Sequence, residues 1–213
     1  MLMRIINSLI IILFFSLPTF AQNDFTKVLD DEVLRESIRK HSSETFTIKS
    51  KFSQEKHLSM LEEVVISSGR FLFKKENNIR WEYSLPFEYT IIVANGKFLI
   101  NNEGKLSEFD ISSNPMFKQI SDMIVLAVSG NFVQNDQFNI EFFQNGKYYL
   151  ATLKPVDQQV SEMLSGINIY FDKNALNVEK VKFLEPGNDF TLINFKDYQE
   201  NINLSDEEFT TNK

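Results

Sequence analysis

The sequence predicts a mainly β fold with helices (class α+β): an incomplete antiparallel β-barrel of about ten or eleven strands with a helical lid over a hydrophobic cavity. Alternating segments with a period of two run through most of the chain, and 21 of its 213 residues are Phe. Tight turn signals separate these segments. Few segments have helical periodicity, so there are few helices to cover the sheet. A large apolar sheet must therefore curl to bury its own surface.

The chain opens with an apolar leader. Arg4 supplies a short positive start, residues 5–15 are almost continuous hydrocarbon, and the segment ends in small residues at Ala21. This layout predicts a cleavable signal peptide over residues 1–21, followed by a single domain over residues 22–213. An uncleaved membrane anchor is the alternative, although a bilayer span needs about 20 apolar residues. We therefore expect an exported protein.

The composition excludes several functional classes. The formal net charge is −7 and no cysteine is present. An acidic surface without basic clusters argues against binding to nucleic acid and against attachment to anionic lipid. Without cysteine the chain has no disulfide and no thiolate chemistry, so the core of an exported domain must stabilise itself.

The first segment of the mature chain predicts an amphipathic helix from Asp24 to His41, with Asp24 as its N-cap. Its apolar residues recur at spacings near 3.6 and charged residues lie between them. These apolar residues are Phe25, Val28, Leu29, Leu34 and Ile38.

From Thr45 the period changes to two, which predicts strands. The predicted strands are 46–52, 64–74, 79–83, 89–94, 97–100, 138–144, 147–153, 166–171, 178–184 and 190–198. The dipeptides Asn95-Gly96 and Asn145-Gly146 predict two-residue hairpin turns, because both positions tolerate positive φ.

The segment from Ser112 to Gly130 interrupts the strands. Pro115 near its start and apolar residues at helical spacing behind it predict a second helix, which would cover the sheet together with the N-terminal helix. A short helical turn is expected within residues 154–165. The acidic tail from Ser205 is expected to fray, except around Phe209.

Several predicted strands are apolar in both registers, as in residues 64–66, 71–73 and 91–93. A large ordinary core explains any one of them. Taken together, these strands present more apolar surface than the few predicted helices can cover. A curled sheet also leaves volume in its concavity. Burial of a long acyl chain is worth on the order of 12 kcal/mol, so a pocket walled by Phe, Ile, Leu and Met side chains would suit an amphiphile.

At this point the sequence resembles a known family, the outer-membrane lipoprotein carrier protein family LolA, over nearly all of the mature chain. The most specific block runs from Gly69 to Gly96: a glycine, alternating hydrophobic residues, a basic pair, Arg-Trp, Pro86, and a hydrophobic strand into Asn-Gly. The segments that carry the resemblance are 51–56 (KFSQEK), 68–75 (SGRFLFKK), 79–83 (IRWEY), 91–97 (IIVANGK), 153–155 (LKP), 167–172 (INIYFD) and 195–201, which precedes Phe209.

The resemblance implies a periplasmic carrier. Its cavity would take the acyl chains of lipoproteins released from the inner membrane and carry them to the outer membrane. The implied partners are acylated lipoproteins and an inner-membrane, ATP-driven release complex, while the outer-membrane acceptor stays unidentified. We expect a monomer that binds no nucleic acid and uses no cofactor.

Trp81 matches the family's cavity-lining tryptophan, although an ordinary core Trp is the alternative. The predicted cavity residues, chosen by strand alternation and helical spacing, are Phe52, Phe71, Phe73, Ile79, Trp81, Tyr83, Ile92, Ile120, Met123 and Ile124. Lys75 and Arg80 are predicted lid contacts, with solvated surface residues as the alternative. Lys75-Glu76 stands where many members have Arg-Pro, and lysine cannot reproduce the planar fork of that latching arginine.

No catalytic or metal site is expected. His41 and His57 are the only histidines, neither lies in an HExxH pattern, and the sequence has no GxSxG elbow or P-loop. The carboxylates are scattered. A periplasmic sensor or carrier of another lipid on the same fold is the alternative function, and a lipid-modifying enzyme is a third for which no nucleophile and base can be named.

Overall fold

The computed structural model of the chain describes residues 24–111, 133 and 136–211. The signal peptide predicted over residues 1–21 lies outside the described residues. So does the predicted mid-chain helix, with its candidate cavity residues Ile120, Met123 and Ile124.

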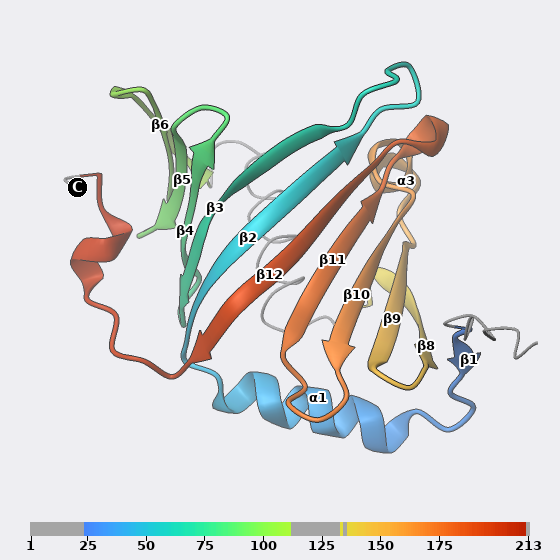
Figure 1. The fold of residues 1–213 in the computed structure, drawn as a ribbon. Helices are drawn as coiled ribbons and strands as arrows, with labels where there is room; N and C mark the ends of the chain where they lie inside the picture. The colour runs from blue at the N-terminus through green and yellow to red at the C-terminus, as the bar shows by residue number, and fades with distance from the viewer. Residues whose placement is uncertain (1–23, 112–132, 134–135, 212–213) are drawn as a thin grey trace, which may run out of the picture.

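The described residues form one antiparallel sheet of twelve strands with few helices (Figure 1). The strands are β1 (Thr26–Lys27), β2 (Thr47–His57), β3 (Val65–Lys74), β4 (Asn78–Leu85), β5 (Tyr89–Ala94), β6 (Lys97–Asn102), β7 (Lys105–Asp110), β8 (Phe138–Gln144), β9 (Tyr148–Pro155), β10 (Gly166–Asp172), β11 (Val178–Leu184) and β12 (Phe190–Glu200). The helices are α1 (Glu32–Glu44), α3 (Gln158–Met163) and the 3-10 turns η3 (Pro186–Asn188) and η4 (Asp206–Phe209).

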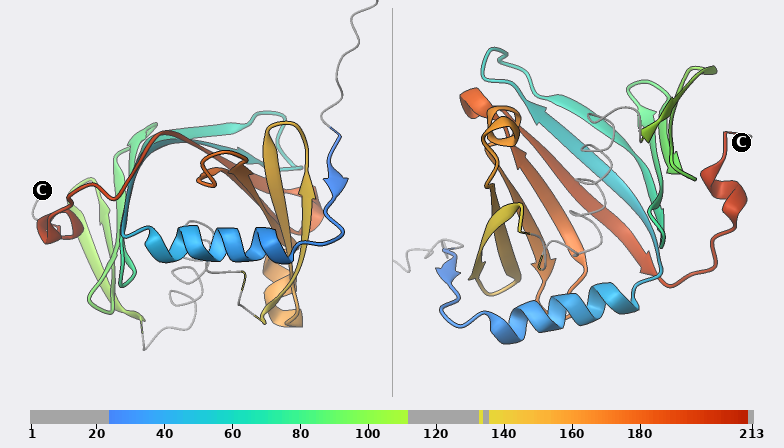
Figure 2. Two further views of the ribbon diagram at one scale, coloured as in Figure 1. Left: turned by 90° about the horizontal axis from the view of Figure 1, so that it is seen from below. Right: turned by 180° about the vertical axis from the view of Figure 1, so that it is seen from behind.

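The sheet is open. Its strand order is β1-β8-β9-β10-β11-β12-β2-β3-β4-β5-β6-β7, so β1 and β7 are its two edges and do not pair with each other. Seen from below, the strands form an arch and α1 runs across its open side (Figure 2). This is the incomplete antiparallel barrel that the sequence predicts, with twelve strands rather than ten or eleven.

The helix at the start of the domain is shorter than the predicted Asp24–His41. It begins at Glu32, because the residues before it form β1, which pairs with β8. The Val28 N–H continues this pairing by donating to the Phe142 carbonyl at 2.9 Å. Helical spacing predicted a continuous helix here, and tertiary hydrogen bonding to a distant strand overrides it. Leu29, expected on the apolar face, is 94% exposed.

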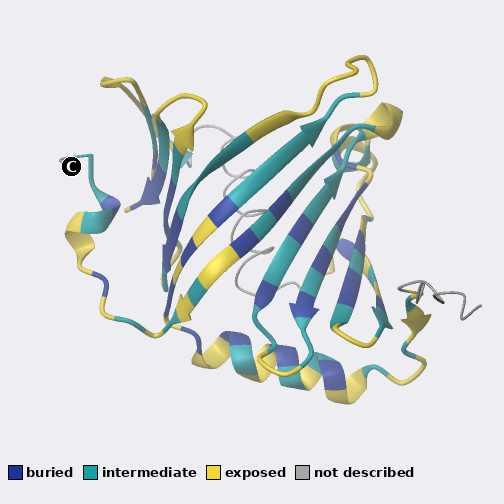
Figure 3. Cartoon of the chain, viewed as in Figure 1, coloured by how far each residue is buried: buried dark blue, intermediate teal, exposed yellow. Residues whose placement is uncertain are grey.

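Helix α1 buries a narrow stripe against the sheet. Its buried residues Leu34, Ile38 and Ser42 are four residues apart and therefore share one face (Figure 3). Asp31 is at the N-cap without a side-chain capping bond, and its carboxylate instead pairs with Arg35 at 2.8 Å. The helix is therefore attached by few buried side chains.

The turns agree in part with the sequence analysis. Asn95 and Gly96 have φ of 52° and 73°, as the predicted two-residue turn between β5 and β6 requires. Glu103 and Gly104 form a similar turn, with φ of 49° and 86°, and lead into β7, a strand that the sequence analysis missed. At the loop after Asn145, the backbone N–H of Asn145 donates to the Tyr148 carbonyl at 3.0 Å, and the Asn145 side-chain Oδ1 accepts hydrogen bonds from two backbone N–H groups.

The tail is ordered over a longer stretch than predicted, and the expected exception around Phe209 is confirmed. The tail forms η4, and Phe209 is only 4% exposed. Figure 1 shows this segment leaving β12 and running along the outside of the sheet beside β4 and β5. The tail is ordered because it covers apolar side chains on that side of the sheet.

Candidate functional site

The concave side of the sheet, called the inner face below, is covered by apolar side chains. Every strand from β2 to β6 and from β8 to β12 contributes at least one buried residue to one continuous cluster, and α1 adds Leu34 and Ile38. Among the described residues, the buried polar or charged side chains are Ser42, Thr45, Thr47, Ser50 and Arg80. An apolar surface that spans so many strands can shield hydrocarbon from water without directional bonds.

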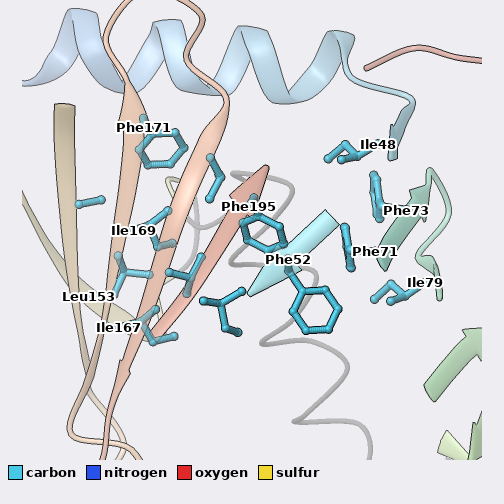
Figure 4. Packing of buried hydrophobic residues seen from close by; sticks show 14 of the residues in the cluster. Ile48, Phe52, Phe71, Phe73, Ile79, Leu153, Ile167, Ile169, Phe171 and Phe195 are labelled. Carbon is cyan, nitrogen blue, oxygen red and sulfur yellow. The ribbon is translucent and has the colours of Figure 1, made fainter. Parts of the chain in front are cut away.

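Aromatic rings form the centre of the inner face. Phe52, Phe71, Trp81 and Phe195, the aromatic cluster, come from four consecutive strands of the sheet order, β12, β2, β3 and β4. The Trp81 ring centroid lies 5.0 Å from those of Phe52 and Phe71 and 6.1 Å from that of Phe195, all in tilted or edge-on arrangements. Figure 4 shows Phe52 and Phe195 side by side with Phe71 next to them. Such ring pairs add stability beyond that of their buried area.

Gly69 lets rings from non-adjacent strands meet. It stands between Phe52 on β2 and Tyr83 on β4 in the strand register. A Cβ at this position would lie 1.8 Å from the Glu82 carbonyl oxygen, so no other residue fits without a backbone shift. Phe52 and Tyr83 therefore pack edge to face across it, with centroids 5.1 Å apart.

Among the residues that the structure describes, polar atoms are few at this centre. The half-buried Tyr83 donates its hydroxyl hydrogen to the side-chain oxygen of Gln54 at 3.0 Å. Burial raises the pKa of Tyr83 to about 12, and the side chains of Gln54 and Trp81 act in the opposite direction. Trp81 is 6% exposed, and its indole Nε1 has no hydrogen-bond partner in the described part of the chain.

The predicted cavity residues that the structure describes lie together, with one exception. Phe52, Phe71, Phe73, Ile79 and Trp81 are buried in the inner-face cluster and Tyr83 packs against it. The prediction that Ile92 faces the cavity is wrong. Ile92 pairs with Arg80 in the register and is buried on the opposite, outer face. Its neighbours Ile91 and Val93 face inward instead. In a run of three apolar residues alternation alone cannot fix the register, because either choice buries hydrocarbon.

The outer face carries its own small apolar cluster. Leu72, Ile92 and Ala94 are covered by Leu204 and Phe209 of the C-terminal segment. This outer cluster is separated from the aromatic cluster by the thickness of the sheet, because successive residues of a strand point to opposite faces.

Arg80 is also corrected, since it lies on the outer face and holds the C-terminal segment. Its side chain is 6% exposed and pairs with Glu82 at 2.7 Å. The guanidinium also donates to the backbone carbonyls of Thr210 at 3.0 Å and of Glu208 at 3.3 Å.

Glu82 is held by two arginines. Arg70 donates to both of its carboxylate oxygens at 3.0 Å, in addition to Arg80. Burial acts to raise the pKa of Glu82, but the hydrogen bonds from Arg70 and Arg80 outweigh it and hold the pKa below its usual value. The carboxylate is therefore ionised at neutral pH and links the two arginines.

Lys75 contacts the covering helix. Its ammonium donates to the Ser43 carbonyl in the last turn of α1 and lies 4.1 Å from the centroid of the Phe46 ring. A cation at the C-terminal end of a helix is favourable because of the helix dipole. Lys75 thus ties the β3–β4 turn to the end of α1, although with one donor rather than the fork that an arginine would supply.

Phe195 belongs to the aromatic cluster although it was not among the predicted cavity residues. It pairs with Phe52 in the register and completes the cluster from β12. The signal was available, because Ile193 and Phe195 share a face by alternation. What the sequence did not show was that β12, near the end of the chain, pairs with β2 near its start.

The histidines have structural partners at separate places. His41 lies 2.9 Å from Glu200, and His57 lies 3.2 Å from Glu55 and stacks on Phe190. Within the described ranges, no three metal-binding side chains cluster. No helix in the described part of the chain has the length and apolarity needed to cross a bilayer.

Comparison with protein families gives one match. The family described as "Outer membrane lipoprotein carrier protein LolA" matches residues 43–212, which is most of the chain and includes every strand from β2 to β12. No curated protein matches the chain.

Solved structures with similar folds are distant in sequence. An uncharacterized conserved protein from Thermus thermophilus is 10% identical with a TM-score of 0.51, over 82% of this chain and 91% of that one. A LolA superfamily protein from Nitrosomonas europaea is 10% identical with a TM-score of 0.43, over 83% and 97%. A putative outer membrane lipoprotein-sorting protein domain from Vibrio parahaemolyticus is 9% identical with a TM-score of 0.45, over 84% and 96%.

Proposed function

Because the chain belongs to the LolA family of outer-membrane lipoprotein carrier proteins, we propose that it is a periplasmic carrier. It binds the acyl chains of lipoproteins against the inner face and moves them from the inner to the outer membrane. The observation that carries the proposal is the continuous apolar inner face, to which ten strands contribute buried side chains.

The aromatic cluster is the proposed centre of the acyl-binding site. Phe52, Phe71 and Trp81 present ring surfaces, and Phe73 and Ile79 extend the apolar wall toward α1. Acyl chains are recognised by apolar contact, so this wall needs no precise hydrogen bonds. The candidate residues Ile120, Met123 and Ile124 remain a sequence-based proposal for the cover.

Transfer requires that the carrier open and close. Helix α1 suits a movable cover because it buries only a narrow stripe of side chains. Its end is tied to the sheet by Lys75 through Ser43 and by His41 through Glu200. We propose Lys75 as the contact that replaces the latching arginine expected from the family.

The partners proposed are acylated lipoproteins and an ATP-driven release complex in the inner membrane. The carrier itself needs neither nucleotide nor cofactor, because the affinity of the cargo need only lie between those of donor and acceptor. The acidic net charge of −7 keeps such a carrier from adhering to anionic lipid surfaces between the two.

The test is to ask whether the purified mature protein keeps a triacylated lipoprotein soluble without detergent. Ile100→Lys places a charge on the inner face, where Ile100 packs against the main cluster. Thr90→Lys is the matched control, because Thr90 is also half-buried but lies on the same face of β5 as Ile92. We expect the first variant to lose most of the cargo and the second to retain it.

Failure of the wild-type protein to hold the lipoprotein would remove the proposal. If mass spectrometry then found another lipid bound to the protein from its native host, the site would be that of a carrier for a different amphiphile. If the two variants retained the lipoprotein equally, cargo binding would not depend on the inner face.

A further inference from the structure

The indole N–H of Trp81, in the middle of the apolar inner face, is near enough to the Tyr83 hydroxyl to lower its pKa, but it makes no hydrogen bond of normal geometry in the described residues. The residue is 6% exposed, and in the described residues Nε1 has no acceptor. Buried donors without a partner are rare in folded proteins, because desolvation of an N–H group is unfavourable unless an acceptor replaces water. Packing alone could be achieved by Phe, which carries no such donor, so the N–H calls for an explanation.

The surroundings of Trp81 define which acceptor could fit. Phe52, Phe71 and Phe195 surround it with hydrocarbon at ring distances of 5.0 to 6.1 Å. Tyr83 follows Trp81 on the same face of β4 and leads toward the half-exposed end of the cluster.

The neighbouring polar groups are neutral. The Tyr83 hydroxyl stays protonated at neutral pH and already donates to Gln54, since burial raises the pKa of Tyr83. The amide nitrogen of Gln54 is a further donor on this face, since Gln54 lies two residues from Phe52 on β2. The site therefore offers neutral donors in an apolar setting.

A carboxylate would be a poor ligand here, because the described residues around the indole carry no positive charge and an unpaired buried anion is strongly unfavourable. A pure hydrocarbon would leave the indole donor unpaired. An uncharged carbonyl attached to a long apolar chain satisfies both conditions, because its oxygen accepts from the indole while its chain lies on the rings.

We infer that Trp81, next to the Tyr83–Gln54 pair, binds the ester carbonyl of an acyl chain. The inference rests on the proposed carrier function and adds to it, because apolar contact alone would not distinguish an ester-linked chain from an ether-linked one. Trp81 is then a specificity-determining residue, which sets the depth at which an acyl ester stops in the site.

The experiment uses the fact that the chain has a single Trp. The full mature protein, labelled with ¹⁵N, gives one indole N–H resonance. It is titrated with glycerol monopalmitate and with its ether counterpart, hexadecyl glycerol, which has the same length and charge but no carbonyl. We expect the ester to bind about tenfold more tightly, to move the indole proton resonance downfield and to slow its exchange with water.

Trp81→Phe removes the N–H and keeps an aromatic ring. We expect it to reduce ester affinity to that of the ether and to leave ether affinity nearly unchanged. Phe71→Leu is the control, because loss of a ring that carries no donor should weaken both lipids equally.

Equal affinities of the wild-type protein for the two lipids, with no difference in the indole resonance, would overturn the inference and leave the carrier proposal intact. Binding of neither lipid would overturn both. The wild-type comparison decides the matter even if Trp81→Phe does not fold.

Discussion

The two faces of strands β3, β4 and β5 both carry apolar side chains, but these side chains are buried in different ways. On the outer face, Leu72, Ile92 and Ala94 are covered by the protein's own C-terminal segment, and Arg80 satisfies the carbonyls of that segment. On the inner face, the aromatic cluster lies under an arch that α1 crosses at one side, and among the described residues it retains a donor without an acceptor. Among the described residues, the outer face is thus covered by the C-terminal segment, whereas the inner face combines apolar surface with one polar atom that has no partner.

The largest effect is expected from the inner face. Phe71→Ala should lower the free energy of unfolding by about 3–5 kcal/mol, because Phe71 is fully buried and touches Trp81 and Phe195. Urea unfolding followed by Trp81 fluorescence measures it. Leu72→Ala, one residue along and facing outward, is the comparison and should cost less, since the C-terminal segment can shift to fill the space. An equal or larger loss from Leu72→Ala would contradict the distinction between the faces.

The next effect tests how the outer face is closed. Arg80→Ala should destabilise the protein by about 2–4 kcal/mol, because it removes a buried charge that pairs with Glu82 and donates to the C-terminal segment. Hydrogen exchange of the variant should be faster than that of the wild type in η4, and the increase should be larger there than in β12. Arg70→Ala should cost under about 1 kcal/mol, because its side chain is 39% exposed. Unchanged exchange in η4 would mean that Arg80 does not hold the segment.

A smaller effect comes from the pH dependence of the inner face. Burial raises the pKa of Tyr83 to about 12, so the folded protein keeps this proton after the unfolded chain has lost it. Stability is therefore unaffected by Tyr83 below about pH 10 and should fall by about 1–3 kcal/mol as the pH rises from about 10 to about 12. Tyr83→Phe should reduce this loss, and unfolding curves at a series of pH values measure it. Identical alkaline profiles for the two proteins would show that Tyr83 is not buried as described.

The smallest effect concerns the cover of the inner face. Lys75→Met should lower stability by about 0.5–1 kcal/mol, because it removes a cation at the end of α1 and above the Phe46 ring. Hydrogen exchange in the last turn of α1 should accelerate, while exchange in β3 stays unchanged. Lys75→Arg should restore or increase protection. If all three proteins exchanged alike in α1, Lys75 would not be a latch.

Much of this architecture followed from local patterns. Period-two alternation predicted ten of the twelve strands, and the Asn95-Gly96 turn was fixed by the positive φ that its residues tolerate. The same alternation placed Phe71 and Phe73 on one face and Trp81 and Tyr83 on another strand's matching face. These features depend on neighbouring residues only, so the sequence carries them directly.

Other features were decided by partners distant in the chain. The residues of β1 fitted a helical pattern, but hydrogen bonds to β8 made them extended. The six residues of strand β7 are all exposed. Its two apolar residues, Leu106 and Phe109, are three positions apart, so the sequence shows no alternation with a period of two there. The face of Ile92 was set by its pairing with Arg80, since three consecutive apolar residues carry no register of their own.

The sequence alone therefore determined most of the strands, most of the turns and most of the aromatic residues of the candidate site. What only the tertiary structure decided is that, among the described residues, the C-terminal segment covers the outer face of the sheet and α1 packs against the inner face. The reason is physical: alternation tells which residues share a face, but only long-range pairing, such as that of Arg80 with Thr210, determines what lies against that face.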